Sequence, residues 1–75
     1  MYYESFPSRL RAARQKNGFT LREAGTELRI PHSTLANYEI GRTQPDIETL
    51  GRLAEFYGVS VDWLMGIQIN EKTAR

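Results

Sequence analysis

The stretch "IPHSTLANYEIGRTQPD", from Ile30 to Asp46, contains a short helix between residues that stop helices. Pro31 suits a first helical turn, where a missing N–H costs nothing, and Gly41 suits the position after a helix end. Leu35 and Tyr38 supply one apolar stripe, whereas the residues between them are mostly small and polar. Because a helix with so little apolar area is only weakly held by its own packing, we expect a partner to cover its polar face.

The preceding helix is predicted over residues 20–28, and it starts at a capping box. In "TLRE" the Thr20 hydroxyl can accept a free backbone N–H, while the Glu23 carboxylate can reach back to the backbone of the cap. Its apolar stripe is Leu21, Ala24 and Leu28. A tight turn at residues 29–30 then leads into the predicted helix 31–39, so the two helices form a helix–turn–helix unit.

Three further helices are expected over residues 7–16, 47–57 and 61–65, and glycine punctuates the end of each. Asp46 and Ser60 stand where helix caps are favoured. The apolar residues of the first two recur at helical spacing: Phe6, Leu10 and Ala13, then Ile47, Leu50, Leu53, Ala54 and Tyr57. Links of only a few residues predict that successive helices pack as neighbours, and no strand is expected.

The length of 75 residues predicts one domain, over residues 1–69, with a polar tail at 70–75. The chain has no cysteine and a single histidine, His32, so neither a disulfide nor a metal site is expected. The start carries no apolar leader, and no apolar run approaches the roughly 20 residues of a membrane span. We therefore expect a cytoplasmic protein with no cofactor, membrane or small-molecule ligand.

Basic residues gather in the first part of the chain. Residues 1–29 contain six Lys or Arg and three Glu. Residues 46–75 contain three Lys or Arg and five Asp or Glu. This asymmetry permits one face to meet a polyanion, although ordinary charged helix surfaces would explain it equally well.

The outward side of the predicted helix 31–39 follows from its inward stripe: it carries His32, Ser33, Ala36 and Asn37, with Thr34 at the edge. The second helix of a helix–turn–helix unit can enter the major groove of DNA. An Asn amide suits adenine there, and Ser or Thr hydroxyls suit several bases. The simpler alternative is that the hydroxyls only cap the helix and that the amide is solvated.

Two longer motifs carry a resemblance to a known family. "STLANYEIGRTQPD" and "LAEFYGVSVDWLMG" resemble the Xre/Cro/cI-type helix–turn–helix repressors of phages and bacteria, and the similarity extends from Leu10 to Gly66. It implies an all-α, five-helix bundle of the lambda repressor-like DNA-binding type. It also implies a homodimer that binds double-stranded DNA at a two-fold operator.

The resemblance assigns roles to individual positions. The residues implied to contact bases are His32, Ser33, Thr34 and Asn37. Those implied to contact the DNA backbone are Arg42 and Thr43, through guanidinium, hydroxyl and backbone N–H groups. Arg14 and Glu39 are implied to form a half-buried ion pair. The last helix is implied to contribute Trp63 and Met65 to a dimer interface.

The chain departs from the family pattern at four positions. Leu21 replaces a glutamine that contacts phosphate, and we expect Arg22 to compensate by contacting the DNA backbone. Gly25 replaces a small alanine and permits a close helix approach. Arg29 replaces the turn glycine, so we expect either that Arg29 takes a positive φ or that the turn differs from the family's. Pro31 stands where the family favours a capping Ser or Thr.

Three classes of function compete. A sequence-specific DNA-binding regulator, most simply a repressor, fits the small polar face of helix 31–39. A protein-interaction module, such as an antitoxin or an adaptor, would want apolar anchors on that face. An enzyme is disfavoured because the sequence lacks a nucleophile–base–acid set and a glycine-rich phosphate loop.

Overall fold

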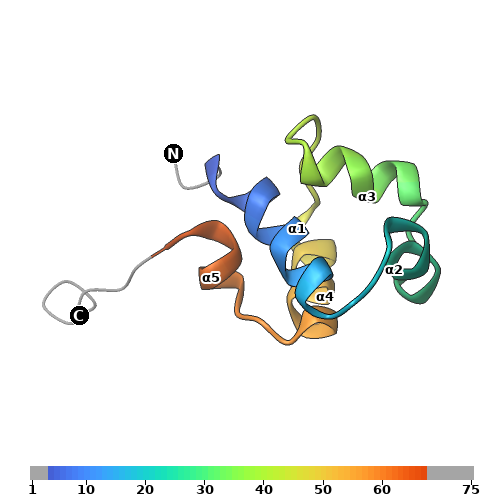
Figure 1. The fold of residues 1–75 in the computed structure, drawn as a ribbon. Coiled ribbons are helices and arrows are strands. Elements are labelled where there is room, and N and C mark those ends of the chain that lie inside the picture. Colours follow the sequence, from blue (N-terminus) through green and yellow to red (C-terminus); the bar gives the residue numbers. More distant parts are fainter. Residues whose placement is uncertain (1–3, 68–75) are drawn as a thin grey trace, which may run out of the picture.

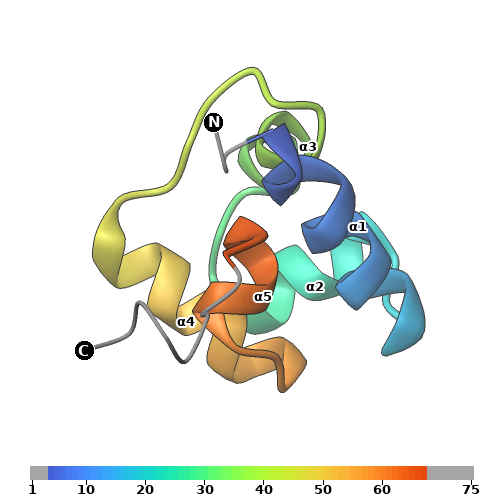
Figure 2. The same ribbon diagram turned by 90° about the vertical axis from the view of Figure 1, so that its left-hand side faces the viewer.

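The computed structural model describes residues 4–67, which form five α-helices and, within that range, no strand. The helices are α1 (Phe6–Lys16), α2 (Leu21–Leu28), α3 (His32–Glu39), α4 (Ile47–Tyr57) and α5 (Val61–Met65). In Figure 1, α2 and α3 occupy one end of the molecule and α5 the other, with α1 and α4 between them. Figure 2 shows the molecule from the α5 end. The predicted all-α, five-helix fold is confirmed, and the predicted polar tail at 70–75 lies outside the described residues.

Four leucines from four different helices form the centre of the core. Leu10 of α1, Leu35 of α3, Leu53 of α4 and Leu64 of α5 are each fully buried. Burial of one such side chain contributes about 1.5–3 kcal/mol, so these residues hold the helices together far more strongly than helix propensity could. The core also contains Phe6, Ala13, Ala24, Leu28, Ile30, Ala54 and Tyr57.

The helix caps lie where the sequence predicts them. In the capping box of α2, the Glu23 N–H donates to the Thr20 hydroxyl oxygen (3.0 Å), and the Thr20 N–H donates to the Glu23 carboxylate (2.9 Å). The side chain of Asp46 caps α4 by accepting the Thr49 N–H at 2.8 Å, and that of Ser60 caps α5. These oxygen atoms satisfy N–H groups that the helices leave free.

Three predicted boundaries are shifted by one residue. The first helix begins at Phe6 rather than Pro7, α2 begins at Leu21 rather than Thr20, and α3 begins at His32 rather than Pro31. Pro31 has ψ 136°, which is extended, so it precedes the first turn instead of belonging to it.

Two predictions about packing are wrong. Helical spacing placed Ile47 on the buried stripe, but it is 89 % exposed because the first residue of α4 lies beyond the core. Successive helices do pack together in α2–α3 and α4–α5, yet α1 packs mainly against α3 and α5 rather than α2. The extended segments that join α1 to α2 and α3 to α4 allow these helices to diverge.

Residues 4–67 contain neither a membrane-spanning helix nor a cluster of metal ligands. No helix in this range is long and apolar enough to cross a membrane. No group of three or more His, Cys, Asp or Glu side chains in the same range is arranged to hold a metal ion.

The cap of α4 should make stability depend on pH. Hydrogen bonds from the Thr49 side chain and backbone lower the pKa of Asp46 below its ordinary value of 3.8, so the ionised cap stabilises the fold above that pH. We expect Asp46→Ala to lower the melting temperature at neutral pH, with a smaller difference from the wild type as the pH falls well below 3.8. Asp46→Asn is the matched control, because it keeps the acceptor oxygen without titrating. A difference between the wild type and Asp46→Ala that stays constant in thermal melts from neutral to strongly acidic pH would contradict this account.

Candidate nucleic-acid interface

Helix α3 is fixed on its inner side and open on its outer side. Leu35 is fully buried between α1 and α2, and Tyr38 is half-buried against the core. On the outer side His32 and Ser33 are exposed, while Thr34 and Asn37 are partly exposed. The structure therefore brings the four predicted base-contacting side chains onto one accessible helix, and all four carry hydrogen-bonding groups.

The buried end of α3 is held by an ion pair. The Arg14 guanidinium on α1 donates to both carboxylate oxygens of Glu39, through Nε at 2.7 Å and Nη2 at 3.0 Å. Its remaining Nη1 donates to the carbonyl of Phe19 at 2.8 Å, which ties the α1–α2 link to the same guanidinium. Both Arg14 and Glu39 are only 8 % exposed, so the bidentate geometry compensates for lost hydration.

The ion pair affects the pKa values of Arg14 and of the neighbouring Tyr57. The hydrogen bonds to Glu39 raise the pKa of Arg14 above its ordinary value. Burial, together with the negative charge of Glu39, raises the pKa of Tyr57 to about 12, so that hydroxyl stays neutral. The Tyr57 hydroxyl is buried and has no hydrogen-bond partner among residues 4–67.

The α2–α3 turn has the conformation that the replaced glycine led us to expect. Arg29 adopts φ 59° and ψ 40°, and within residues 4–67 it is the only non-glycine residue with positive φ. A left-handed conformation costs an L-residue about 1–2 kcal/mol. The Ile30 N–H donates to the Gly25 carbonyl at 2.9 Å, which closes the turn.

Gly25 allows α3 to start close to α2. A Cβ atom at Gly25 would lie 2.7 Å from the Ile30 carbonyl oxygen and 3.3 Å from the His32 backbone. Such contacts are with backbone atoms that cannot move aside cheaply, so glycine is required for this approach.

The predicted backbone-contacting residues lie at the two ends of α3. Arg42 and Thr43 follow its C-terminal end and are exposed, and Arg22 lies on α2 beside its N-terminal end. We expected the backbone N–H groups of Arg42 and Thr43 to be free for phosphate. They instead donate to the Asn37 carbonyl at 2.9 and 3.4 Å, so only the side chains can serve.

One contact with the turn was not foreseen from the sequence. The Arg52 guanidinium, on α4, donates to the Leu28 carbonyl at the end of α2. It satisfies an acceptor that the helix leaves free and links α4 to the turn before α3. No sequence signal pointed to this contact, because Arg52 occupies a position on α4 that reads as an ordinary solvated surface.

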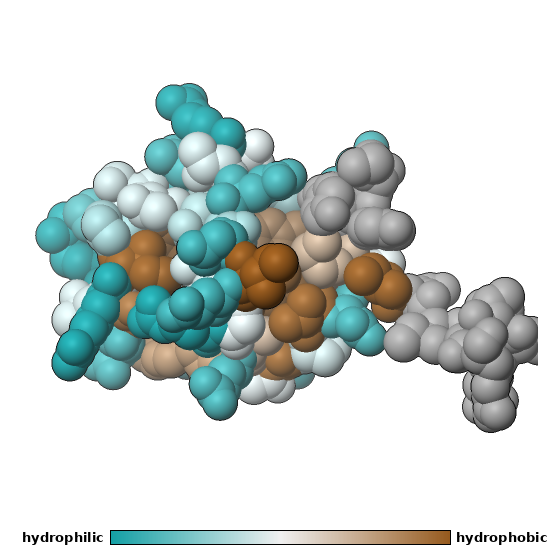
Figure 3. Space-filling model, turned by 180° about the vertical axis from the view of Figure 1, so that it is seen from behind, coloured by the Kyte–Doolittle hydropathy of each residue, from teal (hydrophilic) through white to brown (hydrophobic). Residues whose placement is uncertain are grey.

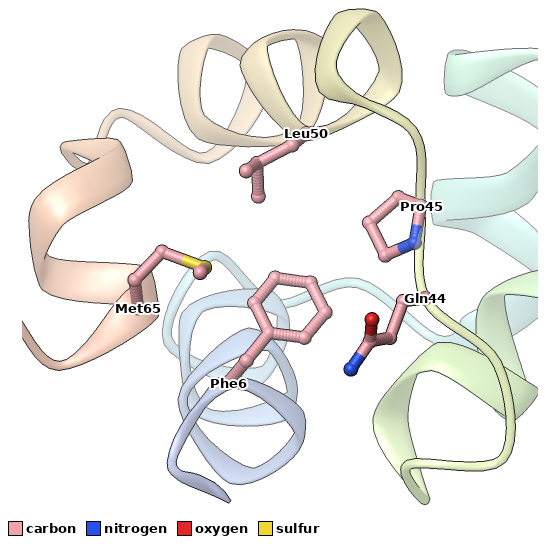
Figure 4. A pocket seen from close by; sticks show the side chains of 5 residues that line it. All are labelled: Phe6, Gln44, Pro45, Leu50 and Met65. Atoms are coloured by element: carbon pink, nitrogen blue, oxygen red, sulfur yellow. The ribbon is translucent and has the colours of Figure 1, made fainter. Parts of the chain in front are cut away.

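The predicted dimer residues make contacts within the chain. Trp63 is 39 % exposed, and the Arg9 guanidinium lies 5.0 Å from its ring centre and donates to its carbonyl at 2.7 Å. Met65 is half-buried and lines an apolar hollow of about 50 Å³, shown in Figure 4, together with Phe6, Gln44, Pro45 and Leu50. Figure 3 shows apolar side chains gathered from the middle of the rear face toward the α5 end.

In this protein a tight turn joins α2 to α3, and α3 is anchored on its inner side and polar on its outer side. This arrangement defines the helix–turn–helix class of proteins. A helix–turn–helix family profile matches residues 10–64. The chain is 45 % identical over 62 residues to the HTH-type transcriptional regulator ImmR of Bacillus subtilis. The aligned residues make up 83 % of this chain and 49 % of that protein. It is 41 % identical over 61 residues to the regulator DdrOP3 of Deinococcus deserti (80 % of this chain, 47 % of that protein). It is also 35 % identical over 60 residues to the prophage-derived HTH-type transcriptional regulator YonR of Bacillus subtilis (80 % of this chain, 56 % of that protein).

The chain therefore belongs to the Xre-type helix–turn–helix family of DNA-binding transcriptional regulators, as its motifs predict. It spans about half the length of the curated relatives described above.

The buried ion pair gives a direct prediction. Glu39→Ala leaves the Arg14 charge buried without its partner, and Arg14→Met does the same to Glu39, so each should lower the free energy of unfolding by about 3–5 kcal/mol. The double variant Arg14→Met/Glu39→Ala should lose much less than the sum of the two single changes. Urea denaturation of the four proteins measures this coupling. Single variants as stable as the wild type would show that the pair does not hold α3.

Proposed function

We propose that this chain binds double-stranded DNA with sequence specificity and acts as a transcriptional repressor. The observation that carries the proposal is the construction of α3: its inner side is locked by Leu35 and Glu39, and its outer side exposes short hydrogen-bonding groups. A rigid helix with such a face fits the major groove, where bases present distinct donors and acceptors. Occlusion of a promoter would then repress transcription, and DNA as the target places the protein in the cytoplasm.

The proposed base contacts belong to His32, Ser33, Thr34 and Asn37. The side chain of Asn37 is only partly exposed, which suits an amide that must be held in one orientation to pair with adenine. Arg42 and Thr43 would bind phosphate at the C-terminal end of α3, and Arg22 would do so near its N-terminal end. Phosphate contacts at both ends of the helix would set its register on the duplex.

The proposal includes a homodimer on a two-fold operator. One domain of this size binds a half-site weakly, and a second copy supplies affinity by raising the effective concentration. The apolar residues around the α5 end support a contact between copies, since Trp63 and Ile67 are exposed and Met65 lines the hollow of Figure 4. Half-sites are then expected about 34 Å apart, one turn of DNA.

The test is a selection of random duplex DNA by the purified wild-type protein, followed by sequencing at two salt concentrations. A two-fold motif with half-sites one turn apart is the expected result. Retention without any motif, lost as salt rises, would leave only charge-driven binding. No retention at all would overturn the proposal and favour the protein-interaction alternative.

Asn37→Ala should weaken binding to the selected duplex by about tenfold or more, because a good bidentate base contact contributes about 1–3 kcal/mol of discrimination. Binding to random duplex should change little. The Asn37 carbonyl that organises the following loop is retained in this variant. Gln15→Ala, which removes an exposed amide from α1, is the matched control and should bind both duplexes normally. Equal losses on both duplexes would remove Asn37 from the base contacts.

Arg42→Gln should weaken binding to every duplex. Each phosphate contact contributes about 0.9 to the slope of log affinity against log salt concentration, so the slope should fall by about that amount. Lys16→Gln carries the same change of charge in the groove between α1 and the α4–α5 link, away from α3, and should leave the slope unchanged. A wild-type slope for Arg42→Gln would exclude a phosphate contact there.

A further inference from the structure

A cationic groove runs along the α2–α3 turn. This turn groove is lined by Arg22, Gly25, Thr26, Arg29, Pro31 and His32, among others. No carboxylate lines it, although Arg22 and Thr26 also line the adjoining groove along α2 that carries Glu23 and Glu27, whereas Arg29 lines only the turn groove. The turn groove therefore collects two guanidinium groups, a hydroxyl and an imidazole, which together suit an anionic ligand.

Arg29 is unusual within this groove. Elsewhere in residues 4–67 every positive φ is adopted by glycine, at Gly18, Gly41, Gly58 and Gly66, whereas here a long cationic side chain tolerates the left-handed conformation. The side chain is exposed, and among the described residues it makes no ion pair or hydrogen bond. The packing of the fold thus gives no reason for a charge at this turn. Glycine would adopt this backbone conformation without strain, so the presence of a long cationic side chain here invites a functional explanation.

The backbone geometry brings the start of α3 against α2, beside the groove. Because Gly25 has no side chain, the His32 backbone lies close against α2, where a Cβ atom would be 3.3 Å away. The N-terminus of α3 has no side-chain cap, and Pro31 and His32 at that end line the groove. Its free N–H groups add partial positive charge to that of Arg22 and Arg29.

We propose that the turn groove binds a phosphodiester of the DNA backbone and that Arg29 is its principal phosphate ligand. The site rests on the DNA binding proposed above and extends it beyond Arg42 and Thr43 at the other end of α3. Arg29 and Arg22 can each present a planar fork of donors to phosphate oxygens, and Thr26 contributes a hydroxyl. The arginine that replaces the turn glycine is then a binding residue rather than an incidental substitution.

Three substitutions of Arg29 separate charge from backbone conformation. Arg29→Gln keeps the strained L-residue and removes the charge, Arg29→Lys keeps the charge, and Arg29→Gly removes both the charge and the strain. Lys16→Gln again serves as the charge-matched control away from the groove. Each protein is measured for its affinity to the duplex selected by the wild type and to a random duplex, over a range of salt, and for its melting temperature.

The expected result is a fall of about 0.9 in the salt slope for Arg29→Gln and Arg29→Gly on both duplexes, with the slope kept by Arg29→Lys and Lys16→Gln. Arg29→Gly should bind more weakly although its melting temperature is not lowered, a combination that a merely structural role cannot produce. Wild-type slopes for Arg29→Gln and Arg29→Gly would overturn the groove while leaving the proposed function intact. The wild-type protein could instead bind duplex without any motif while the salt slope still falls in the Arg29→Gln and Arg29→Gly variants. That result would overturn the proposed sequence specificity and support the phosphate site in the turn groove. Absence of duplex binding by the wild type would overturn both.

Discussion

The ion pair between Arg14 and Glu39 fixes the direction in which the outer face of α3 points. The pair joins α1 to the last residue of α3 through two hydrogen bonds of 2.7 and 3.0 Å, and a third bond from the same guanidinium holds the α1–α2 link. Leu35 anchors the middle of α3 and Tyr38 is half-buried against the core, but so narrow an apolar stripe restrains rotation of a helix poorly. The charged pair supplies the missing restraint, so the polar side chains keep a defined orientation.

The opposite end of α3 is set by backbone geometry rather than by charge. Gly25 lets the turn lie against α2, Arg29 takes the left-handed conformation, and Arg52 reaches from α4 to the last carbonyl of α2. Together with the ion pair, these contacts hold a helix of only eight residues at both ends. A helix fixed in this way can leave its outer face polar without losing its place in the fold, which explains how a segment with so few apolar residues stays helical.

The sequence predicts the elements of this fold well because each is marked by local chemistry. The capping box at Thr20, the cap at Asp46 and the glycines that end helices act over a few residues, and the structure contains all of them. The errors concern features that periodicity does not encode. Ile47 fits the helical stripe but lies in the first turn of α4, outside the core. The contact between Arg52 and Leu28, 24 residues apart, depends on how α4 crosses α2. The base-contacting and dimer residues came from the resemblance to a family, and their roles remain predictions.

The most direct test of the claim that α3 is the DNA-reading surface is a nuclear magnetic resonance titration of the ¹⁵N-labelled protein with the selected duplex. The account predicts that the largest shifts of amide signals fall in α3, in the α2–α3 turn around Arg29 and in the loop at Arg42 and Thr43. Shifts confined to α4 and α5, with those of α3 unchanged, would contradict it.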